Sequence, residues 1–195
     1  MGLTFVAPAA RAQGGDMIPH PSWGIVAGAN FANVTGDDFD DGDNRTGFMA
    51  GVTGTFHFTR MFALNTGLLF SQEGSKDPNS DLAIHENMLQ LPILARVAFP
   101  TSTGKVTPFI EAGPTAAFSL SCKFTDGDDD VDCDDFTGTD VKKFEFGVAG
   151  GAGLRFNAGT HAIEVGGRYQ QALTDALKDA DAKNKVISVF AGFTI

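Results

Sequence analysis

The sequence lacks any apolar run of about 18 residues, the length that a transmembrane helix needs. It is also short of tyrosine and tryptophan, with one of each among 195 residues, and of charged residues, which make up 19%. A helical membrane span is therefore excluded. If the chain crosses a membrane, it must do so as a closed β-barrel, because lipid offers no hydrogen-bonding partner to an open sheet edge.

Basic residues are scarce as well. Lys and Arg number 14 against 24 Asp and Glu, which gives a net charge of −10. Binding to phosphate backbones needs a basic surface, so we expect no nucleic-acid partner. The acidic residues gather mainly in residues 37–43 and 126–135, which we interpret as loops.

The N-terminal stretch resembles the end of a secretory signal. Residues 3–10 are apolar, and Ala10-Arg11-Ala12 fits the small-x-small pattern of a cleavage site. We therefore divide the chain into a signal-peptide remnant (1–12), a short N-terminal segment (13–22) and one barrel domain (23–195). A disordered, alanine-rich leader is the alternative interpretation of the first residues.

Cysteine is limited to Cys122 and Cys133, which share one acidic segment. An exported protein meets an oxidising compartment, so a local disulfide between them is the natural interpretation. A metal site is less well supported, because no histidine or further cysteine lies nearby. The sequence indicates no cofactor.

Period-two alternation of apolar and small or polar residues is the main positive signal. In residues 46–59, for example, Phe48, Val52 and Phe56 share one face, whereas Met49 and Thr53 share the other. The pattern predicts eight strands at about 23–34, 46–59, 61–72, 86–99, 106–120, 141–157, 160–171 and 186–195.

The connections between these strands alternate in length. Those near residues 60, 101–105 and 157–159 are short, and those at 35–45, 73–85, 121–140 and 172–185 are long and polar. This alternation is typical of outer-membrane barrels with short periplasmic turns and long extracellular loops. The predicted fold is an all-β, eight-stranded, antiparallel up-and-down transmembrane barrel. An even strand number sets both termini in the periplasm.

Alternation alone does not decide which face points inward, and a soluble lipocalin-like barrel would bury the apolar face instead. Three features favour lipid outside: a balanced set of charges on the polar face, many small residues there, and aromatic residues at strand ends. The charged residues of the polar face are Arg96, Glu111, Glu145, Arg155, Glu164 and Arg168. We predict that they form a charge ladder across the lumen near its short-turn half, with Glu164 diagonal to Arg155 and Glu111 diagonal to Arg96. Ordinary surface pairs are the alternative.

Five segments resemble the strands of the PorT-like outer-membrane β-barrel family, whose architecture is related to the OmpA and OmpX barrels. They are residues 87–96 (NMLQLPILAR), 107–114 (TPFIEAGP), 144–156, 163–173 and 186–195, in the family's order. The resemblance implies a bacterial outer-membrane location, contact with lipid, and recognition of the C-terminal strand by the assembly machinery. Phe190 and Phe193 supply aromatic residues to that strand, although it ends in Ile195 rather than the usual Phe.

No catalytic constellation is recognisable, because His20, His57, His85 and His161 lie in different segments, and we do not expect an enzyme. The acidic loops are the candidate binding sites, for weak capture of divalent cations, although neither fits an EF-hand. Solvated loops are the alternative. The candidate cation-binding residues are Asp37, Asp38, Asp40, Asp41, Asp126, Asp128, Asp130 and Asp132.

These observations favour an outer-membrane barrel with a plugged, charge-paired lumen and a structural or surface-interaction role. A narrow pore for ions or small solutes is the alternative, although side chains fill the lumen of a barrel of about eight strands. A soluble lipid-binding barrel and an enzyme are weaker candidates. The sequence identifies no ligand or partner for the extracellular loops.

Overall fold

The computed structural model describes residues 21–35, 43–76, 82–126, 129–132, 143–174 and 183–195. Its strands are β1 (Pro21–Thr35), β2 (Asp43–His57), β3 (Phe62–Lys76), β4 (Leu82–Ala98), β5 (Val106–Asp126), β6 (Asp129–Asp132), β7 (Phe144–Ala158), β8 (His161–Ala172) and β9 (Lys183–Thr194). No helix in these ranges is long and apolar enough to cross a membrane.

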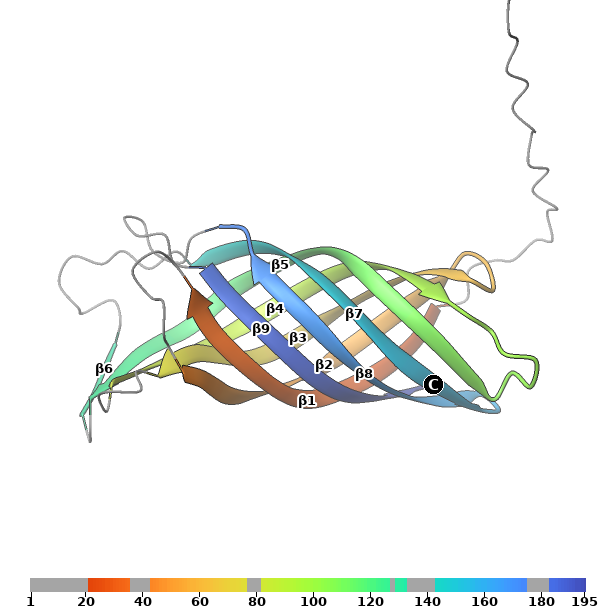
Figure 1. The fold of residues 1–195 in the computed structure, drawn as a ribbon, viewed down its shortest axis with the longest axis horizontal. Coiled ribbons are helices and arrows are strands. Elements are labelled where there is room, and N and C mark those ends of the chain that lie inside the picture. The colour runs from red at the N-terminus through yellow and green to blue at the C-terminus, as the bar shows by residue number, and fades with distance from the viewer. Residues whose placement is uncertain (1–20, 36–42, 77–81, 127–128, 133–142, 175–182) are drawn as a thin grey trace, which may run out of the picture.

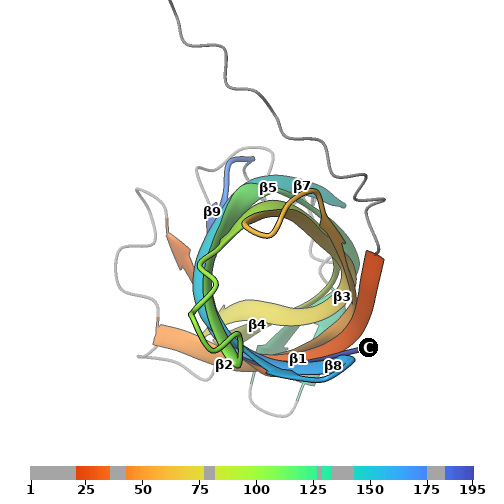
Figure 2. The same cartoon turned by 90° about the vertical axis from the view of Figure 1, so that its right-hand side faces the viewer.

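Eight of the strands form a closed antiparallel barrel. Their order is β4-β3-β2-β1-β9-β8-β7-β5, and the pairing of β4 with β5 closes the ring (Figures 1 and 2). β6 pairs only with the last residues of β5, Lys123 to Asp126, beyond the part of β5 that pairs with β7. The predicted eight-stranded antiparallel barrel is confirmed.

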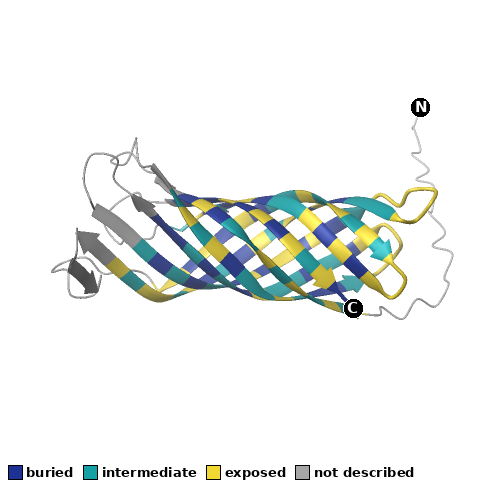
Figure 3. Ribbon diagram, turned by 90° about the horizontal axis from the view of Figure 1, so that it is seen from below, coloured by how far each residue is buried: buried dark blue, intermediate teal, exposed yellow. Residues whose placement is uncertain are grey.

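The two faces of each strand differ in the way that the alternation predicts. Buried and exposed residues alternate along the strands (Figure 3), and β7 changes face at almost every residue over its first half. The outward side chains are mainly large and apolar, such as Ile25, Val52, Leu68 and Ile110, each about half exposed. The buried inward set is mixed and includes many polar and charged residues. A soluble barrel with an apolar interior and a polar exterior is therefore excluded.

The strands extend further than predicted at the end opposite the short turns. β3 continues to Lys76 and β4 begins at Leu82, whereas the alternation indicated boundaries near residues 72 and 86. The signal of alternation depends on one apolar and one polar environment. Where a strand leaves the apolar belt, both faces tolerate polar residues, and the pattern fades although backbone pairing continues.

The turn between β7 and β8 fixes the register of the lumen charges. Ala158 pairs with His161, so the turn contains only Gly159 and Thr160, and Gly159 has a φ of 67°. We had predicted a turn of the same length one residue earlier, which shifts the pairing by two residues and puts Glu164 diagonal to Arg155. Because the turn lies at Gly159 and Thr160, Glu164 instead lies directly opposite Arg155.

The barrel interior also holds apolar side chains that the alternation did not single out. Met49, Leu69, Phe109 and Phe190 form a buried cluster. Phe109 pairs with Gly153, Gly153 with Gly166, and Gly166 with Phe190, so two glycines lie side by side between two phenylalanines. A Cβ on either glycine would lie within 3 Å of a phenylalanine ring atom. The glycines thus make room for aromatic side chains inside a narrow barrel.

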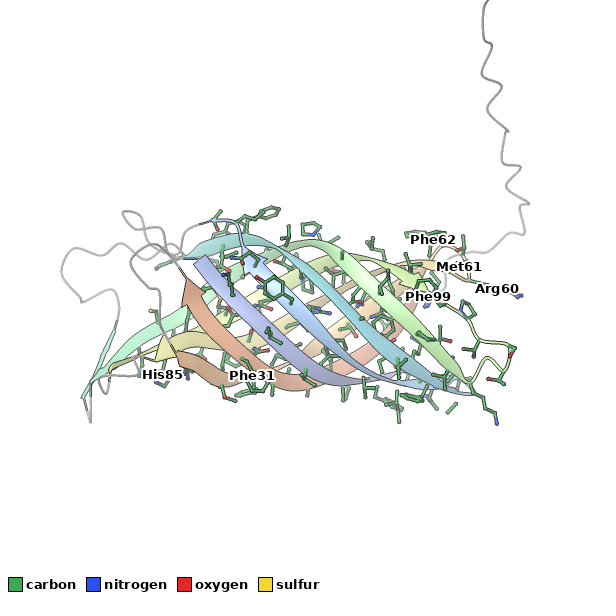
Figure 4. All side chains as sticks on the ribbon, in the orientation of Figure 1. Phe31, Arg60, Met61, Phe62, His85 and Phe99 are labelled. Atoms are coloured by element: carbon green, nitrogen blue, oxygen red, sulfur yellow. The ribbon has the colours of Figure 1, made fainter. Side chains whose placement is uncertain are left out.

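Aromatic side chains mark both ends of the outer surface. Phe62 and Phe99 lie at the short-turn end beside Arg60 and Met61, whereas Phe31 lies toward the opposite end (Figure 4). The remaining predicted aromatic residues are Trp23, Phe58 and Phe156 at the short-turn end and Phe70, Phe118, Phe144 and Tyr169 at the other. All of these except Phe70 are exposed. The arrangement fits two interfacial belts around an apolar band.

Candidate functional site in the barrel lumen

Arg96 is the centre of a buried ion-pair network that crosses the lumen. Its Nη2 donates to Oε2 of Glu111 at 2.8 Å, and its Nη1 donates to Oε1 of Glu164 at 2.9 Å. Arg96 and Glu111 are direct partners on β4 and β5, but Glu164 stands on β8, which is not a neighbour of β4. A single guanidinium therefore links strands on different sides of the barrel.

Two further arginines complete this network, which we call the charge ladder. Arg155 Nη1 donates to Glu164 Oε1 at 2.8 Å, and Arg168 Nη2 donates to Glu111 Oε1 at 2.8 Å. Asn65 Nδ2 adds a hydrogen bond to Glu111 Oε2 at 3.0 Å. Glu111 and Glu164 thus each accept hydrogen bonds from at least two donors. A buried carboxylate needs such partners to offset the loss of hydration.

Aromatic rings from the apolar cluster support two of the arginines. The guanidinium carbon of Arg96 lies 4.0 Å from the centre of the Phe109 ring, and that of Arg168 lies 5.4 Å from the Phe190 ring. A cation over an aromatic face is attracted by the ring quadrupole, more strongly when water is excluded. Packing and charge pairing therefore seal the same section of the lumen.

The structure brings together five of the six residues predicted for the ladder and corrects the place of the sixth. Glu145 has no arginine within ion-pair distance among the described residues. Its Oε2 accepts a hydrogen bond from Asn184 Nδ2 at 2.8 Å. It faces the lumen as predicted, but it lies near the start of β7, whereas Arg155 lies near its end. The alternation gave its face correctly but could not give its level along the barrel axis.

Glu145 belongs instead to a second group of buried carboxylates, which we call the outer cluster: Glu73, Glu86 and Glu145. Their relative exposures are 1%, 8% and 5%. Glu73 and Glu86 are directly opposite each other on β3 and β4. We had placed Glu73 in a polar loop and Glu86 at the very start of a strand, so the sequence did not predict that these two residues face each other.

A small cavity opens at the short-turn end of the lumen and reaches the ladder. Its volume is about 30 Å³, and Arg96, Arg155, Phe109 and His57 contribute to its wall. This volume accommodates about one water molecule. The cavity is therefore too small for an organic ligand.

The predicted disulfide concerns a part of the chain that is only partly described. No described cysteine is a free thiol, and Cys122 lies in β5 near the start of the β5–β6 pairing. Cys133 lies outside the described residues, so its pairing with Cys122 stays a prediction.

Most of the acidic residues predicted to bind cations lie in or next to segments that the structure does not describe. Asp37, Asp38, Asp40, Asp41 and Asp128 lie outside the described residues, as do residues 1–20 with the predicted signal remnant. Asp126 ends β5, and Asp130 and Asp132 belong to β6. Within the ranges that the structure covers, no group of three His, Cys, Asp or Glu could hold a metal ion.

The histidines take separate positions. His57, His85 and His161 belong to β2, β4 and β8, and His20 lies outside the described residues. His161 stacks on Phe193, with 5.5 Å between the ring centres, on the outer face at the short-turn end. His85 Nδ1 lies 2.6 Å from Arg45 Nη2 at the other end. The three described histidines therefore contribute to separate contacts rather than to one site.

A model of the outer membrane protein beta-barrel domain matches residues 12–178. The chain belongs to this family. The barrel is therefore a protein of the bacterial outer membrane, which confirms the predicted location and the lipid environment. No curated protein matches the chain. The finer assignment to the PorT-like family stays a prediction.

Solved structures show the same fold at low identity. Neisserial surface protein A is 12% identical, with a TM-score of 0.52 over 89% of this chain and 97% of its own. The outer membrane protein OprG from Pseudomonas aeruginosa is 15% identical, with a TM-score of 0.50 over 91% and 97%.

Proposed function

We propose that this barrel is a structural or surface-interaction protein whose lumen is closed by the charge ladder and whose longer loops face the cell exterior. In this orientation the short turns and both chain ends face the periplasm. The protein carries out no catalysis, and its contacts are with lipid and with an extracellular partner.

The observation that carries the proposal is the connection from Arg96 to Glu111 and Glu164. Solute passage along the axis would require these buried pairs to separate. Leaving one member of a buried pair without its partner costs about 3–5 kcal/mol. The Phe109 and Phe190 rings beside Arg96 and Arg168 add an apolar seal to the same section. If no solute passes through the lumen, the loops are the part of the protein that can bind a partner.

The C-terminal strand supports insertion by the outer-membrane assembly machinery. Phe193 and Ile195 are exposed on the outer face, where a recognition factor could reach them. Phe190, which we had grouped with Phe193, is buried in the lumen at 6% exposure. The proposed signal therefore consists of the outward residues only, and Phe190 has a packing role.

Single-channel recording in planar bilayers tests the closed lumen. The refolded wild-type protein is expected to insert and to leave the current baseline silent. The double variant Arg96→Ala, Glu164→Ala is expected to give current steps, because it removes both residues that cross the lumen. The matched control, Thr66→Ala with Thr160→Ala, changes two residues outside the ladder and should stay silent.

A narrow pore is the second candidate, and the small cavity beside Arg96 and Arg155 favours it, because it has room for about one water molecule next to the ladder at the short-turn end. In this case the ladder would act as a gate. Steady, ion-selective steps from the wild-type protein would support the pore and contradict the closed barrel.

A further inference from the structure

The charges of the lumen are separated along the barrel axis. Among the described residues, the ladder contains Arg96, Arg155 and Arg168 against Glu111 and Glu164. The outer cluster contains the three carboxylates Glu73, Glu86 and Glu145, and none of the ion pairs between described side chains includes them. The order of residues along β3 shows the separation. Leu69 lies between Asn65, which hydrogen-bonds to Glu111 of the ladder, and Glu73.

Neutral side chains hydrogen-bond to the three carboxylates of the outer cluster in two separate groups. Ser71 Oγ donates to Glu73 Oε1 at 2.9 Å, and Gln90 Nε2 donates to the same oxygen. Asn184 donates to Glu145 and is also hydrogen-bonded to Glu86. Asn184 thus bridges two carboxylates, whereas Glu73 takes both of its neutral donors on a single oxygen.

Among the described residues, the other oxygen of Glu73 has no hydrogen-bond partner. Glu73 is 1% exposed, and its Oε2 is buried without a hydrogen bond from any described group. Its cross-strand partner is a second carboxylate, Glu86. Like charges directly opposite each other on a sheet are destabilising, and a buried charged oxygen without a donor is costly. This position therefore favours a positive charge, which none of the described side chains supplies to Glu73 Oε2.

Neutral groups face the outer cluster from β1 and β9, namely Asn30, Asn184 and Ser188. The described charged or titratable side chains of the other strands toward the same end of the barrel include Arg45 (β2), His85 and Glu86 (β4), Lys123 (β5) and Glu145 (β7).

Arg45 is the cation nearest to Glu73 in this set, but it is engaged elsewhere. Its Nη1 donates to the backbone oxygen of Glu73 rather than to the carboxylate, and its Nη2 contacts His85. Lys123 is exposed on β5, where it pairs with His85 across the strands.

The chemistry of the site selects its occupant. Within the described part of the chain, no three of its acidic or histidine side chains converge in the way that a metal ion requires. A proton needs only one carboxylate oxygen. Bound at Glu73 Oε2, it would remove one of the two opposed charges.

We propose that the outer cluster is a proton-binding site, with Glu73 Oε2 as the atom that carries the proton and Glu86 as the facing carboxylate. The proton comes from water at the loop end of the barrel. Its release places two buried negative charges opposite each other and weakens the pairing of β3 with β4 at that end. The barrel is therefore stabilised at low pH by this site and loosened at its outer end as the pH rises. The inference does not depend on whether the ladder closes the lumen.

Urea unfolding of the refolded protein in lipid vesicles, followed by Trp23 fluorescence between pH 5 and pH 9, tests the site. A proton bound in the folded state and lost on unfolding lowers the folded-to-unfolded ratio as pH rises, by about tenfold per pH unit while the folded state alone holds it. The wild-type protein should show this fall. Glu73→Gln, which keeps the shape and the neutral form, should lack it and should exceed the wild type in stability at pH 9.

The matched control is Glu164→Gln, which removes a buried carboxylate that is already paired with arginines. It should lower the stability at every pH and leave the slope between pH 5 and pH 9 unchanged. Equal slopes for the wild type and Glu73→Gln would overturn the proposal. Restoration of the wild type at pH 9 by calcium chloride would also overturn it, because the occupant would then be a metal ion.

A second measurement needs no variant to fold. Infrared spectroscopy of the wild-type barrel at pH 7 should show the carbonyl stretch of a protonated carboxylic acid, and this band should disappear as the pH is raised. Absence of the band at pH 7 would contradict a proton held by the outer cluster.

Discussion

Arg96 Nη1 and Glu164 Oε1 lie 2.9 Å apart, although the residues are 68 positions apart in the chain and belong to strands that do not pair. Most charge pairs in a sheet connect neighbouring strands. This contact instead runs across the lumen, so it constrains the shape of the barrel as well as its interior. Glu164 also forms an ion pair with Arg155, so one carboxylate neutralises part of the charge of two arginines.

Replacement of Glu164 by Gln should therefore destabilise the barrel. The change leaves Arg96 with one carboxylate and leaves Arg155 with none in the ladder. We expect a loss of about 3 kcal/mol in the free energy of unfolding, in the range measured when one member of a buried pair is removed. Urea titration followed by Trp23 fluorescence measures this loss.

A double-mutant cycle with Arg155→Ala separates the pair from the general effect of burial. Because Arg155 and Glu164 are in contact, the two losses should not add, and an interaction free energy of about 0.5–3 kcal/mol is expected. Additive losses would show that the contact contributes nothing to stability.

Gly153→Ala should destabilise the barrel because the space above Gly153 is occupied. A Cβ there would lie 2.6 Å from Phe109 Cζ and 2.5 Å from the backbone oxygen of Val165. Overpacking of this kind costs about 1–3 kcal/mol. Gly167→Ala is the matched control, since the nearest heavy atom to its Cβ would be at 3.7 Å. Urea unfolding of both variants checks the prediction, and equal stabilities would contradict it.

The predicted disulfide between Cys122 and Cys133 rests on the oxidising conditions that an outer-membrane protein meets outside the cytoplasm. The protein unfolded without reductant should take up no maleimide, and after reduction it should take up two equivalents. Labelling before reduction would refute the bridge.

The sequence was sufficient to predict the number of strands, the closed barrel and the face of almost every strand residue. The reason is that lipid on one side and a narrow lumen on the other enforce strict alternation. The same alternation identified Arg96, Glu111, Arg155, Glu164 and Arg168 as inward-facing. It could not identify direct partners, because these depend on the exact position of each turn, and a turn at Gly159 and Thr160, one residue later than predicted, placed Glu164 opposite Arg155.

Two features of the lumen were beyond the reach of pattern analysis. Glu73 lies where β3 leaves the apolar belt, so no alternation distinguishes it from a loop residue, and Glu86 was therefore left without a predicted partner on that strand. Phe190 and Phe193 are three positions apart on β9 and so lie on opposite faces, but both are phenylalanine, and residue type alone does not say which of them faces the lumen. The position of a residue along the barrel axis depends on stagger between strands, which the sequence does not display.

The apolar outer face makes a prediction that a soluble barrel would not satisfy. Val52 lies between Phe48 and Phe56 on β2 and is 53% exposed, which places it near the middle of the apolar belt. Arginine on the lipid face of an outer-membrane barrel costs about 2–4 kcal/mol at the midplane and about 0–1 kcal/mol near the interface. Val52→Arg should therefore lower the free energy of unfolding in vesicles by about 3 kcal/mol, whereas Thr160→Arg in the exposed turn should change it little. Equal effects of the two substitutions would show that Val52 does not face lipid.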